Sequence, residues 1–415
     1  RQQGATVILV DKGFAGKSGQ TPYARGFMAF NPAWGHRLDD WVSYINKTSE
    51  YVNNRDWTEI TITESYARYQ DLVSWGIKFK QGEDGQPVRR IAPPGVTDNL
   101  EFDCDTKGDY VLILRKQALK AGVKILDRIT VVELLKQDNR IAGAIGIPLD
   151  SYDLYTFIAK ATILCVGGCG FKPAAYPPIV QLTGDGEAMA YRAGAELSGF
   201  EYTLVYYIVK DINAPLLYIT LTRGCHLVNA FDERRDKDHP SIRTMFLEHL
   251  EERGPMRIKL SHLPEEKIRE IESILFTTER PSCERFYEGR GIDFRTGEIE
   301  LWPTEVFLCG GHGLTGVRVS EKAETSIKGL YAAGDTSLVA RGHLSGAFVF
   351  GEIAAESATE CAAGVRHSEL TMPQAAAVSG SGKVGEMAAT VRPGPEETLA
   401  RADLKVLVVE DNLVN

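Results

Sequence analysis

Long hydrophobic runs are missing from this 415-residue sequence. No apolar stretch approaches the roughly 18–20 residues that a helix needs to cross a bilayer, so direct membrane insertion is not predicted. The polar first residues predict no secretory signal peptide. Basic residues are outnumbered, since 47 Lys and Arg stand against 56 Asp and Glu, for a net charge of −9. This balance argues against a general nucleic-acid binder, which normally carries a basic stripe.

Cysteine is scarce, and its spacing matches no metal or disulfide framework. The seven cysteines are scattered and odd in number, which suits a reducing compartment and predicts a cytoplasmic protein. Cys165 and Cys169 are separated by three residues rather than the two of a zinc or redox motif, so we interpret them as structural and predict no metal site. The length and a hydrophobic content of 43% allow two or three domains with a sizeable core.

The glycine motifs of nucleotide-binding proteins do not occur with the spacing or the neighbouring strand and helix that they need. Gly16-Lys17-Ser18 lacks the glycine that a P-loop needs five positions earlier, where Asp11 stands. The pattern G-x-G-x-x-G occurs at 311–316, before a strand pattern, and at 380–385, in a Gly/Ser/Ala-rich stretch. A dinucleotide fold would carry it about 20 residues before the strand that ends at Asp11. The sequence leaves open whether that fingerprint was lost or removed, or whether the dinucleotide interpretation is wrong.

The first segment present is a strand that ends in an acid. Thr6–Asp11 is a continuous apolar run, as in a parallel strand buried on both faces. A carboxylate at this point fits the residue that binds an adenosine ribose in a doubly wound fold. The loop that follows contains Ser18, Gly19, Thr21 and Gly26. It is either a surface turn or a backbone cradle for a flat cofactor.

A second strand and corner lie near the other end of the chain. Gly329–Asp335 predicts a short buried strand that runs into a Gly-Asp turn, and an apolar helix opens at Ser345 and Gly346. The acid can bind ribose or ribityl hydroxyls, and the helix start offers unpaired N–H groups with a partial positive charge. We interpret this stretch as part of a flavin site.

Between these ends, periodicity predicts an alternation of helices and strands. Helical spacing covers 38–76 and 112–121, short strands follow at 123–126, 130–135, 140–146 and 161–168, and a small-residue helix covers 187–195. Charge clusters and polar helices between 200 and 300 indicate a separate smaller domain or lid. From 364 to 403 the Ala/Gly/Ser/Pro composition predicts a flexible linker.

Six motifs in order resemble the flavoprotein family of fumarate reductase and succinate dehydrogenase, nearest the branch of the adenylylsulfate reductase flavoprotein subunit. They include VILVDKG, ATILCVGG, TGDGEAMAYRAGAEL, RGPMRIKLSHL, GLYAAGD and SGAFVFGEIAAESA, within residues 1–363. The resemblance implies an α/β fold with a discontinuous doubly wound FAD-binding domain (1–215 and 301–363) and an inserted α+β capping domain (216–300). It also implies FAD, an iron–sulfur partner protein, and hydride or electron exchange with a small anionic substrate.

The resemblance also assigns roles to individual residues. Asp11 would bind the adenosine ribose, Asp335 the ribityl or pyrophosphate part, and the helix start at Ser345 the pyrimidine end of the flavin. The remaining cofactor-binding candidates line the wall between these points or brace it: Ser18, Gly19, Thr21, Gly26, Cys165, Val166, Gly167, Asp185, Gly334 and Gly346. Members with covalent FAD carry a histidine after the loop serine, whereas Gly19 follows Ser18 here, so FAD should be non-covalent.

The motifs predict the cofactor more specifically than they predict the substrate. The Asn-Arg pair that binds dicarboxylates in the family is replaced by Arg341-Gly342-His343, and the Arg-Asp proton-donating pair has no clear counterpart, so fumarate or succinate is doubtful. A hydride acceptor needs a proton donor and an anion needs a cationic clamp. The candidates are His312, Arg318, Arg341 and His343, with Arg223 and His226 weaker. His312 is equally well explained as a turn histidine, and Arg318 as a surface strand residue.

The last twelve residues, 404–415, resemble the first strand and acidic turn of a response-regulator receiver domain, in which acids matching Glu410 and Asp411 hold Mg²⁺. We expect a dangling strand or a cut-off second domain. The leading hypothesis is therefore an FAD-dependent oxidoreductase subunit, cytoplasmic or peripheral to the inner membrane through its partner. The alternative is a truncated, catalytically impaired flavoprotein remnant fused to a phosphorelay receiver module, with a sensor function as a further variant.

Overall fold

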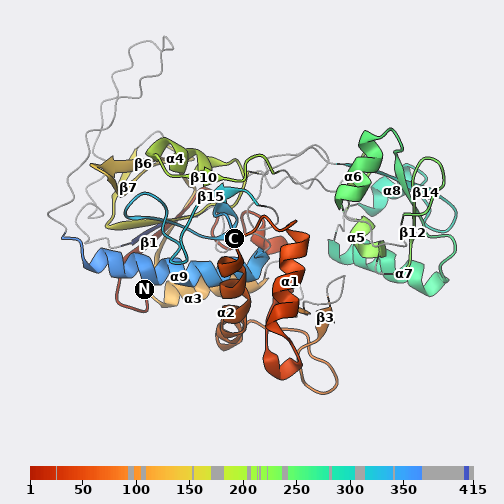
Figure 1. The fold of residues 1–415 in the computed structure, drawn as a ribbon, viewed down its shortest axis with the longest axis horizontal. Coiled ribbons are helices and arrows are strands. Elements are labelled where there is room, and N and C mark those ends of the chain that lie inside the picture. The colour runs from red at the N-terminus through yellow and green to blue at the C-terminus, as the bar shows by residue number, and fades with distance from the viewer. Residues whose placement is uncertain are drawn as a thin grey trace, which may run out of the picture. The chain divides into compact units, whose positions relative to one another are not determined.

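The computed structural model describes residues 1–24, 26–91, 98–103, 109–151, 154–169, 182–202, 207–212, 214, 216–221, 223–235, 242–279, 283–303, 314–339, 342–366 and 406–410. The chain divides into two compact units (Figure 1). Unit 1 comprises Arg1–Gly170, Gln181–Thr203 and Leu308–Asn415, and unit 2 comprises Phe171–Val180 and Leu204–Phe307. The predicted inserted domain, 216–300, falls within unit 2.

A five-stranded parallel sheet forms the centre of unit 1. Its order is β16 (Leu330–Ala332), β9 (Ala161–Cys165), β17 (Val406–Glu410), β1 (Val7–Asp11) and β5 (Lys124–Asp127). The inner strands are apolar throughout, because both faces of a parallel sheet are covered. Side chains from β1, β9, β16 and β17 all join the largest hydrophobic core.

Different layers cover the two faces of this sheet (Figure 1). The long helix α9 (His343–Ala363) packs against β9, β16 and β17. Its buried positions include Ala354, Ala358 and Ala362, whose small side chains let the helix approach the strands closely. On the other face lies an antiparallel meander of β6 (Ile129–Gln137), β7 (Arg140–Pro148) and β8 (Tyr155–Ile158), and α4 (Asp185–Ala193) packs on β6.

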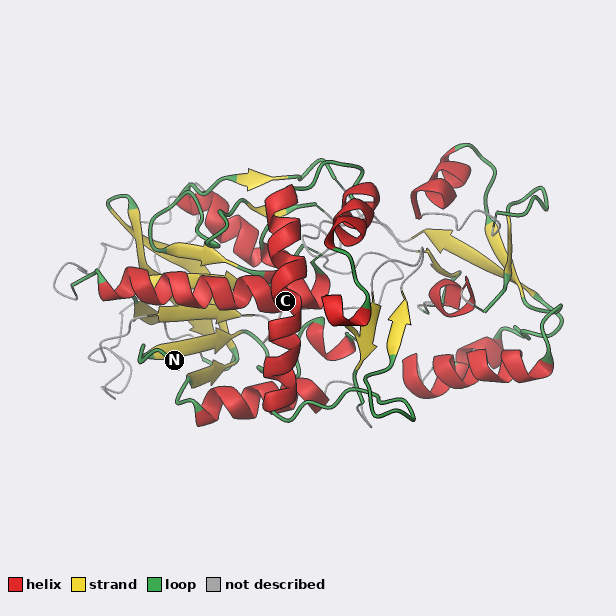
Figure 2. Ribbon diagram, turned by 60° about the horizontal axis from the view of Figure 1, so that its bottom comes forward, coloured by secondary structure: helices red, strands yellow, loops and turns green. Residues whose placement is uncertain are grey.

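The remaining elements of unit 1 surround this core (Figure 2). Two helices in the first quarter of the chain match the predicted helical stretch, and Asn54 caps the second by accepting hydrogen bonds from two backbone N–H groups. The elements are η1 (Thr21–Tyr23), β2 (Gly26–Met28), η2 (Pro32–Trp34), α1 (Leu38–Thr48), α2 (Arg55–Ser74), β3 (Arg89–Ile91), β4 (Asp98–Glu101), α3 (Asp109–Lys120), β10 (Leu197–Ser198), β15 (Gly316–Val317) and η4 (Gly334–Thr336).

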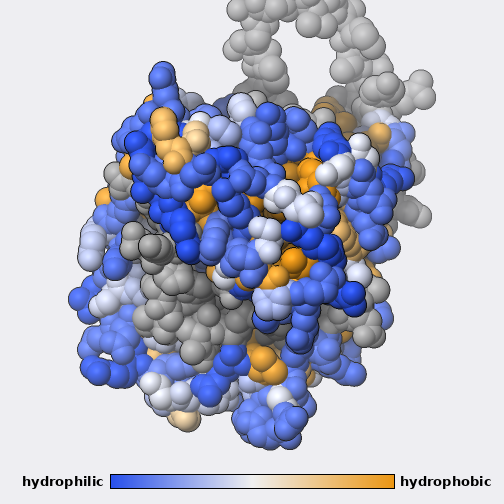
Figure 3. Space-filling model, turned by 90° about the vertical axis from the view of Figure 1, so that its right-hand side faces the viewer, coloured by the Kyte–Doolittle hydropathy of each residue, from blue (hydrophilic) through white to orange (hydrophobic). Residues whose placement is uncertain are grey.

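Unit 2 has its own core and its own antiparallel sheet. The sheet order is β11 (Tyr207–Val209), β14 (Glu298–Pro303), β13 (Met256–Lys259) and β12 (His226–Val228). The helical segments are α5 (Leu216–Leu221), α6 (Ile242–Leu250), α7 (Glu265–Ser273), η3 (Ile274–Glu279) and α8 (Glu284–Gly289). The face of the molecule in Figure 3 is mainly hydrophilic, with small separate hydrophobic patches.

Most predicted elements are confirmed to within a few residues, including the helices at 112–121 and 187–195 and the strands of the meander. Within the described residues, no helix combines the length and apolar character needed to span a membrane. Of the two alternatives for the C-terminal segment, the dangling strand is wrong: Val406–Glu410 does not dangle. It forms β17, the middle strand of the parallel sheet, because its apolar residues pair on both sides with β1 and β9.

Candidate functional site

The carboxyl ends of the parallel strands form one edge of the sheet, and acids gather there. The backbone of Asp11 at the end of β1 is in register with Asp127 at the end of β5 and with Glu410 at the end of β17, which in turn pairs with Cys165. In open α/β sheets this is the edge where ligands bind. The predicted site therefore lies where the topology favours one.

Asp11 is fully buried at this edge. Its Oδ1 accepts a hydrogen bond from the N–H of Gly13 at 2.6 Å, whereas its Oδ2 has no hydrogen-bond partner among the described residues. Burial raises the pKa of Asp11 to about 7, and the neighbouring Asp127 carboxylate adds to the increase. Asp127 is itself neutralised by Arg115, at 2.7 Å. The unpaired oxygen can accept a hydrogen bond from a ligand hydroxyl.

The structure brings together three segments that the sequence analysis selected separately. The Thr336 hydroxyl, next to Asp335 in η4, donates to the backbone oxygen of Gly167 at 3.0 Å. A Cβ added to Gly186, at the start of α4, would lie 2.0 Å from the Val166 side chain and 3.3 Å from that of Thr336. The turn after β9, the Gly-Asp corner after β16 and the beginning of α4 are thus in direct contact.

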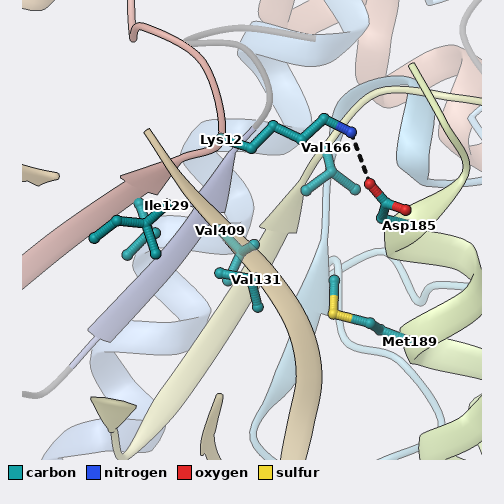
Figure 4. A pocket seen from close by; sticks show the side chains of 8 residues that line it. Lys12, Ile129, Val131, Val166, Asp185, Met189 and Val409 are labelled. Carbon is teal, nitrogen blue, oxygen red and sulfur yellow. Dashed lines mark hydrogen bonds and ion pairs between the residues drawn. The ribbon is translucent and has the colours of Figure 1, made fainter. Parts of the chain in front are cut away.

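A small pocket lies behind this edge (Figure 4). Its walls come from β1, β6, β17, α4 and the turn after β9, and its cavity volume is about 10 Å³, room for about one water molecule. Lys12 crosses its opening and donates to Asp185 at 2.7 Å and to Thr183 at 2.5 Å. Asp185 therefore holds Lys12 at this edge, while its own side chain stays partly exposed.

The loop after β1 is held by its own side chains. Ser18 Oγ accepts from the N–H of Phe14 at 2.5 Å, and a Cβ on Gly13 would lie 2.1 Å from that oxygen. Gly19 has φ of 74°, a left-handed conformation that favours glycine. The backbone oxygen of Thr21 accepts from the buried Tyr110 hydroxyl. These contacts hold the backbone of the loop in place before Gly26 begins β2.

The beginning of α9 is tied to β2. The Ser345 hydroxyl donates to the backbone oxygen of Met28 at 2.8 Å, and Gly346 lies close to Thr61 of α2. The side chain of Ser345 is thus engaged by the protein, and the backbone of the helix start is what a ligand would meet. His343, the first residue of α9, has φ of 47°. A non-glycine residue in this left-handed region costs roughly 1–3 kcal/mol and is typical of functional sites.

The described part of the structure does not bring the catalytic candidates together. Arg318 is exposed and pairs with Glu196 at 2.9 Å, a surface position that does not support its catalytic assignment. His312 and Arg341 lie outside the described residues. In unit 2, Arg223 pairs with Glu270 at 2.9 Å and the ring of His226 stacks on that of His262 at 3.6 Å. Of the four main candidates, His343 alone has described geometry beside the selected segments.

The sequence predicted no role for three residues that lie at this edge: Lys12, Asp127 and Thr336. The signal for Asp127 was present, because residues 124–127 repeat the pattern of an apolar strand that ends in an acid. Lys12 directly follows the acid of β1, but nothing local indicates that it reaches Asp185, 173 positions away. Thr336 follows Asp335, and its bond to Gly167 depends on the pairing of β16 with β9.

Comparison with known proteins gives a consistent result. A family model described as FAD binding domain matches residues 1–349. An uncharacterised FAD-dependent oxidoreductase of Methanocaldococcus jannaschii is 30% identical over 387 residues, covering 85% of this chain and 68% of that protein. A fumarate reductase (CoM/CoB) subunit of Methanothermobacter marburgensis is 26% identical over 358 residues, covering 80% of this chain and 62% of that protein.

Among solved structures, adenylylsulfate reductase of Archaeoglobus fulgidus superposes with a TM-score of 0.70 at 21% identity, covering 85% of this chain and 68% of that chain. At this identity the likeness concerns the fold, and it confirms the predicted fold class. The chain spans about two thirds of the length of the relatives it matches.

Proposed function

We propose a function that starts from one fact: the chain belongs to the FAD binding domain family, and FAD is the cofactor that this membership indicates. With a 30%-identical FAD-dependent oxidoreductase among its relatives, the chain is placed among the FAD-dependent oxidoreductases. We propose that it is a flavoprotein subunit that exchanges a hydride or electrons with a small anionic substrate. When bound, FAD supplies the redox chemistry, and the residues of the chain hold and orient it.

The observation that carries the proposal is the unpaired Oδ2 of Asp11 at the carboxyl edge of the sheet. A buried carboxylate oxygen without a partner is costly, and a hydroxyl donor removes that cost. An adenosine ribose offers two adjacent hydroxyls, which match the two oxygens of a carboxylate at this position of a doubly wound fold. Asp11 is thus proposed to bind the ribose and to become more acidic when it does so.

The flavin end would lie along the rest of the edge. The rigid loop with Ser18, Gly19 and Thr21, the β9 turn with Gly167 and the corner with Asp335 offer backbone N–H groups and one carboxylate. The start of α9 adds a partial positive charge that favours an electron-rich ring. Because Gly19 occupies the position after the loop serine, FAD would be held without a covalent bond.

Substrate chemistry is proposed for the residues that begin α9. His343 is half-buried and has a left-handed backbone conformation, a strained geometry that is concentrated at functional sites. It is proposed to give a proton to the reduced substrate, with Arg341 binding the anion. An iron–sulfur protein is the proposed electron donor, since a relative is named as one subunit of a larger enzyme, and any membrane association would come through that partner.

One observation favours a second candidate, a binding-impaired flavoprotein remnant. The strand that ends beside Asp11 is β17, and the residues after it, 411–415, contain no glycine. A dinucleotide fold uses glycines after this strand to let the backbone approach the pyrophosphate. A flavin site built on β17 would therefore form fewer hydrogen bonds to the phosphates, at roughly 0.5–1.5 kcal/mol each.

A titration with FAD separates the two candidates. The active candidate predicts a yellow protein whose flavin is released on denaturation, and Asp11→Asn should weaken FAD binding by about 10- to 100-fold, since hydrogen bonds to charged groups contribute roughly 1.5–3 kcal/mol. Glu196→Gln, a surface change at the Arg318 pair, is the matched control and should bind like the wild type. A protein that stays colourless with excess FAD would favour the remnant.

Substrate identity needs a separate assay with reconstituted protein. Chemically reduced protein would be mixed with adenylylsulfate or fumarate, and oxidised protein with succinate or sulfite, while flavin absorbance is followed. His343→Gln should lower the rate with the active substrate by roughly 10²- to 10⁴-fold, as expected for a lost proton donor, and leave FAD binding intact. A variant with the wild-type rate would exclude His343 as that donor.

A further inference from the structure

An ion pair lies on the β5 side of Asp11. Its members are Asp127, which ends β5 in register with Asp11, and Arg115, which belongs to α3. Arg115 donates Nη1–H to Oδ1 of Asp127 at 2.9 Å and Nη2–H to Oδ2 at 2.7 Å. The two side chains are only 18% and 19% exposed. A bidentate pair of this kind fixes the orientation as well as the position of both groups.

The same two side chains bind the backbone of the loop after β1. The N–H of Ala15 donates to Oδ1 of Asp127 at 2.9 Å, and the oxygen of Ala15 accepts from Nη1 of Arg115 at 2.8 Å. The guanidinium also lies 4.2 Å from the centroid of the Phe14 ring. Ala15 is fully buried, so its backbone groups need these partners. The loop is therefore held from β5 and α3 as well as by its own side chains.

This loop in turn holds the carboxylate of Asp11. The N–H of Gly13 donates to Oδ1 of Asp11 at 2.6 Å, and the oxygen of Gly13 accepts from the N–H of Arg128 at 2.9 Å. Gly13 is two residues from Ala15, so a displacement of Ala15 would move this donor. While Oδ1 is bound by the loop, Oδ2 stays the oxygen that a ligand hydroxyl can reach.

The ion pair also sets the charge around Asp11. Burial raises the pKa of Asp11 most, and the Asp127 carboxylate raises it further, whereas the cations of Arg115 and Lys12 lower it. These charges come from β5, from α3 and from the residue that follows β1. Loss of Asp127 and loss of Arg115 should therefore shift the pKa of Asp11 in opposite directions. A purely mechanical support would not produce opposite shifts.

We propose that Arg115 and Asp127 are positioning residues for the cofactor, which hold the loop and the charge beside Asp11 so that its carboxylate accepts hydrogen bonds from a ribose. The inference rests on the proposed function, in which Asp11 binds the ribose of FAD. Both residues act through Asp11 and the backbone of Ala15 rather than by touching the ligand. Because ribose hydroxyls donate to the ionised carboxylate, FAD binding releases the proton of Asp11, and the affinity for FAD rises with pH.

The first experiment follows the side-chain carboxyl carbon of Asp11 by NMR in the flavin-free full chain, with Asp11→Asn to assign the signal. Asp127→Asn should move the titration midpoint to lower pH, and Arg115→Gln should move it to higher pH. The matched controls are Glu133→Gln and Arg192→Gln, which break an exposed pair in the same unit and should leave the midpoint unchanged. Shifts in one direction for both test variants, or no shift, would overturn the proposal.

The second experiment separates position from charge by titration with FAD. Arg115→Lys keeps the positive charge but loses the bidentate fork, so the midpoint of Asp11 should stay near its wild-type value while FAD binds about 10-fold more weakly or worse. Wild-type affinity should rise from about pH 6 to pH 8, and Asp11→Asn should lack this rise.

The outcomes distinguish this proposal from the proposed function. Wild-type affinity for FAD in Arg115→Lys would overturn the positioning role and leave the flavin site intact. A wild type that binds no FAD at either pH would overturn the proposed function and with it the role of the pair in cofactor binding. The NMR shifts would in that case still show whether the pair sets the charge at Asp11.

Discussion

Replacing Asp11 by asparagine should change how the stability of the flavin-free protein depends on pH. In the folded protein, burial raises the pKa of Asp11 from its ordinary value of 3.8 to about 7. Well below pH 3.8 the folded and unfolded states both hold the proton. Between these two values the folded state binds more protons than the unfolded state, so stability falls as pH rises. Above about pH 7 both states are ionised and the loss is complete.

The size of the effect follows from the same two pKa values. Between pH 5 and pH 8 the wild type should lose roughly 2–3 kcal/mol of unfolding free energy through Asp11 alone. Asp11→Asn cannot ionise, so its unfolding free energy should not show this decrease with pH. The difference in unfolding free energy between the variant and the wild type should therefore shift in favour of the variant by roughly 2–3 kcal/mol from pH 5 to pH 8. Urea unfolding followed by tryptophan fluorescence measures it, because four of the five tryptophans, at 34, 41, 57 and 75, lie in unit 1.

A matched control isolates the buried carboxyl. Glu196→Gln removes an exposed carboxyl that pairs with Arg318 and should keep the wild-type slope, since an exposed glutamate is ionised throughout this range. Saturation with FAD should flatten the slope of the wild type if ribose hydroxyls donate to the carboxylate. Identical slopes for Asp11→Asn and wild type without flavin would refute the argument from burial.

Three further changes test the geometry of the site. Gly186→Ala should cost about 1–3 kcal/mol of unfolding free energy, because its Cβ would lie 2.0 Å from the Val166 side chain. Gly351→Ala in α9, whose Cβ would meet no atom within 4 Å, should stabilise the protein by about 0.5–1 kcal/mol. Thermal unfolding of both variants measures the contrast. Arg318→Ala should change stability by less than about 0.5 kcal/mol and leave flavin reduction by dithionite and turnover unaffected. A large loss of turnover would instead support its catalytic assignment. Ser345→Ala should cost about 1 kcal/mol in urea unfolding, since the part-buried Met28 oxygen loses this donor, and a neutral result would show that water replaces it.

Local pattern explains why much of the fold was predictable. Continuous apolar runs mark β1 and β9 as strands buried on both faces, and the 3.6-residue period marks α1, α2 and α9. An acid at the end of such a run, as at Asp11, predicts the ligand-binding edge because the carboxyl ends of parallel strands gather there. The chain also carries flavoprotein motifs in order, and the match over residues 1–349 confirms that it belongs to the FAD binding domain family.

Long-range placement was not predictable in the same way. Arg318 reads equally well as a cationic clamp or as a surface residue, and its pairing with Glu196 depends on how β10 meets β15. The left-handed backbone of His343 was not predictable from residue type, because histidine occurs in ordinary as well as left-handed conformations. The bridge from Lys12 to Asp185 joins segments whose distance in sequence says nothing about their distance in space.

The C-terminal strand shows most clearly what cannot be predicted from the sequence. By itself the sequence determined that residues near 406–410 form a short apolar strand, that Asp11 ends another, and that a flavoprotein family contains the chain. Only the tertiary structure decided that β17 lies between β1 and β9, beside Asp11. The physical reason is that a strand buried on both faces needs an apolar segment of the right length, and this requirement carries no information about which part of the chain supplies it.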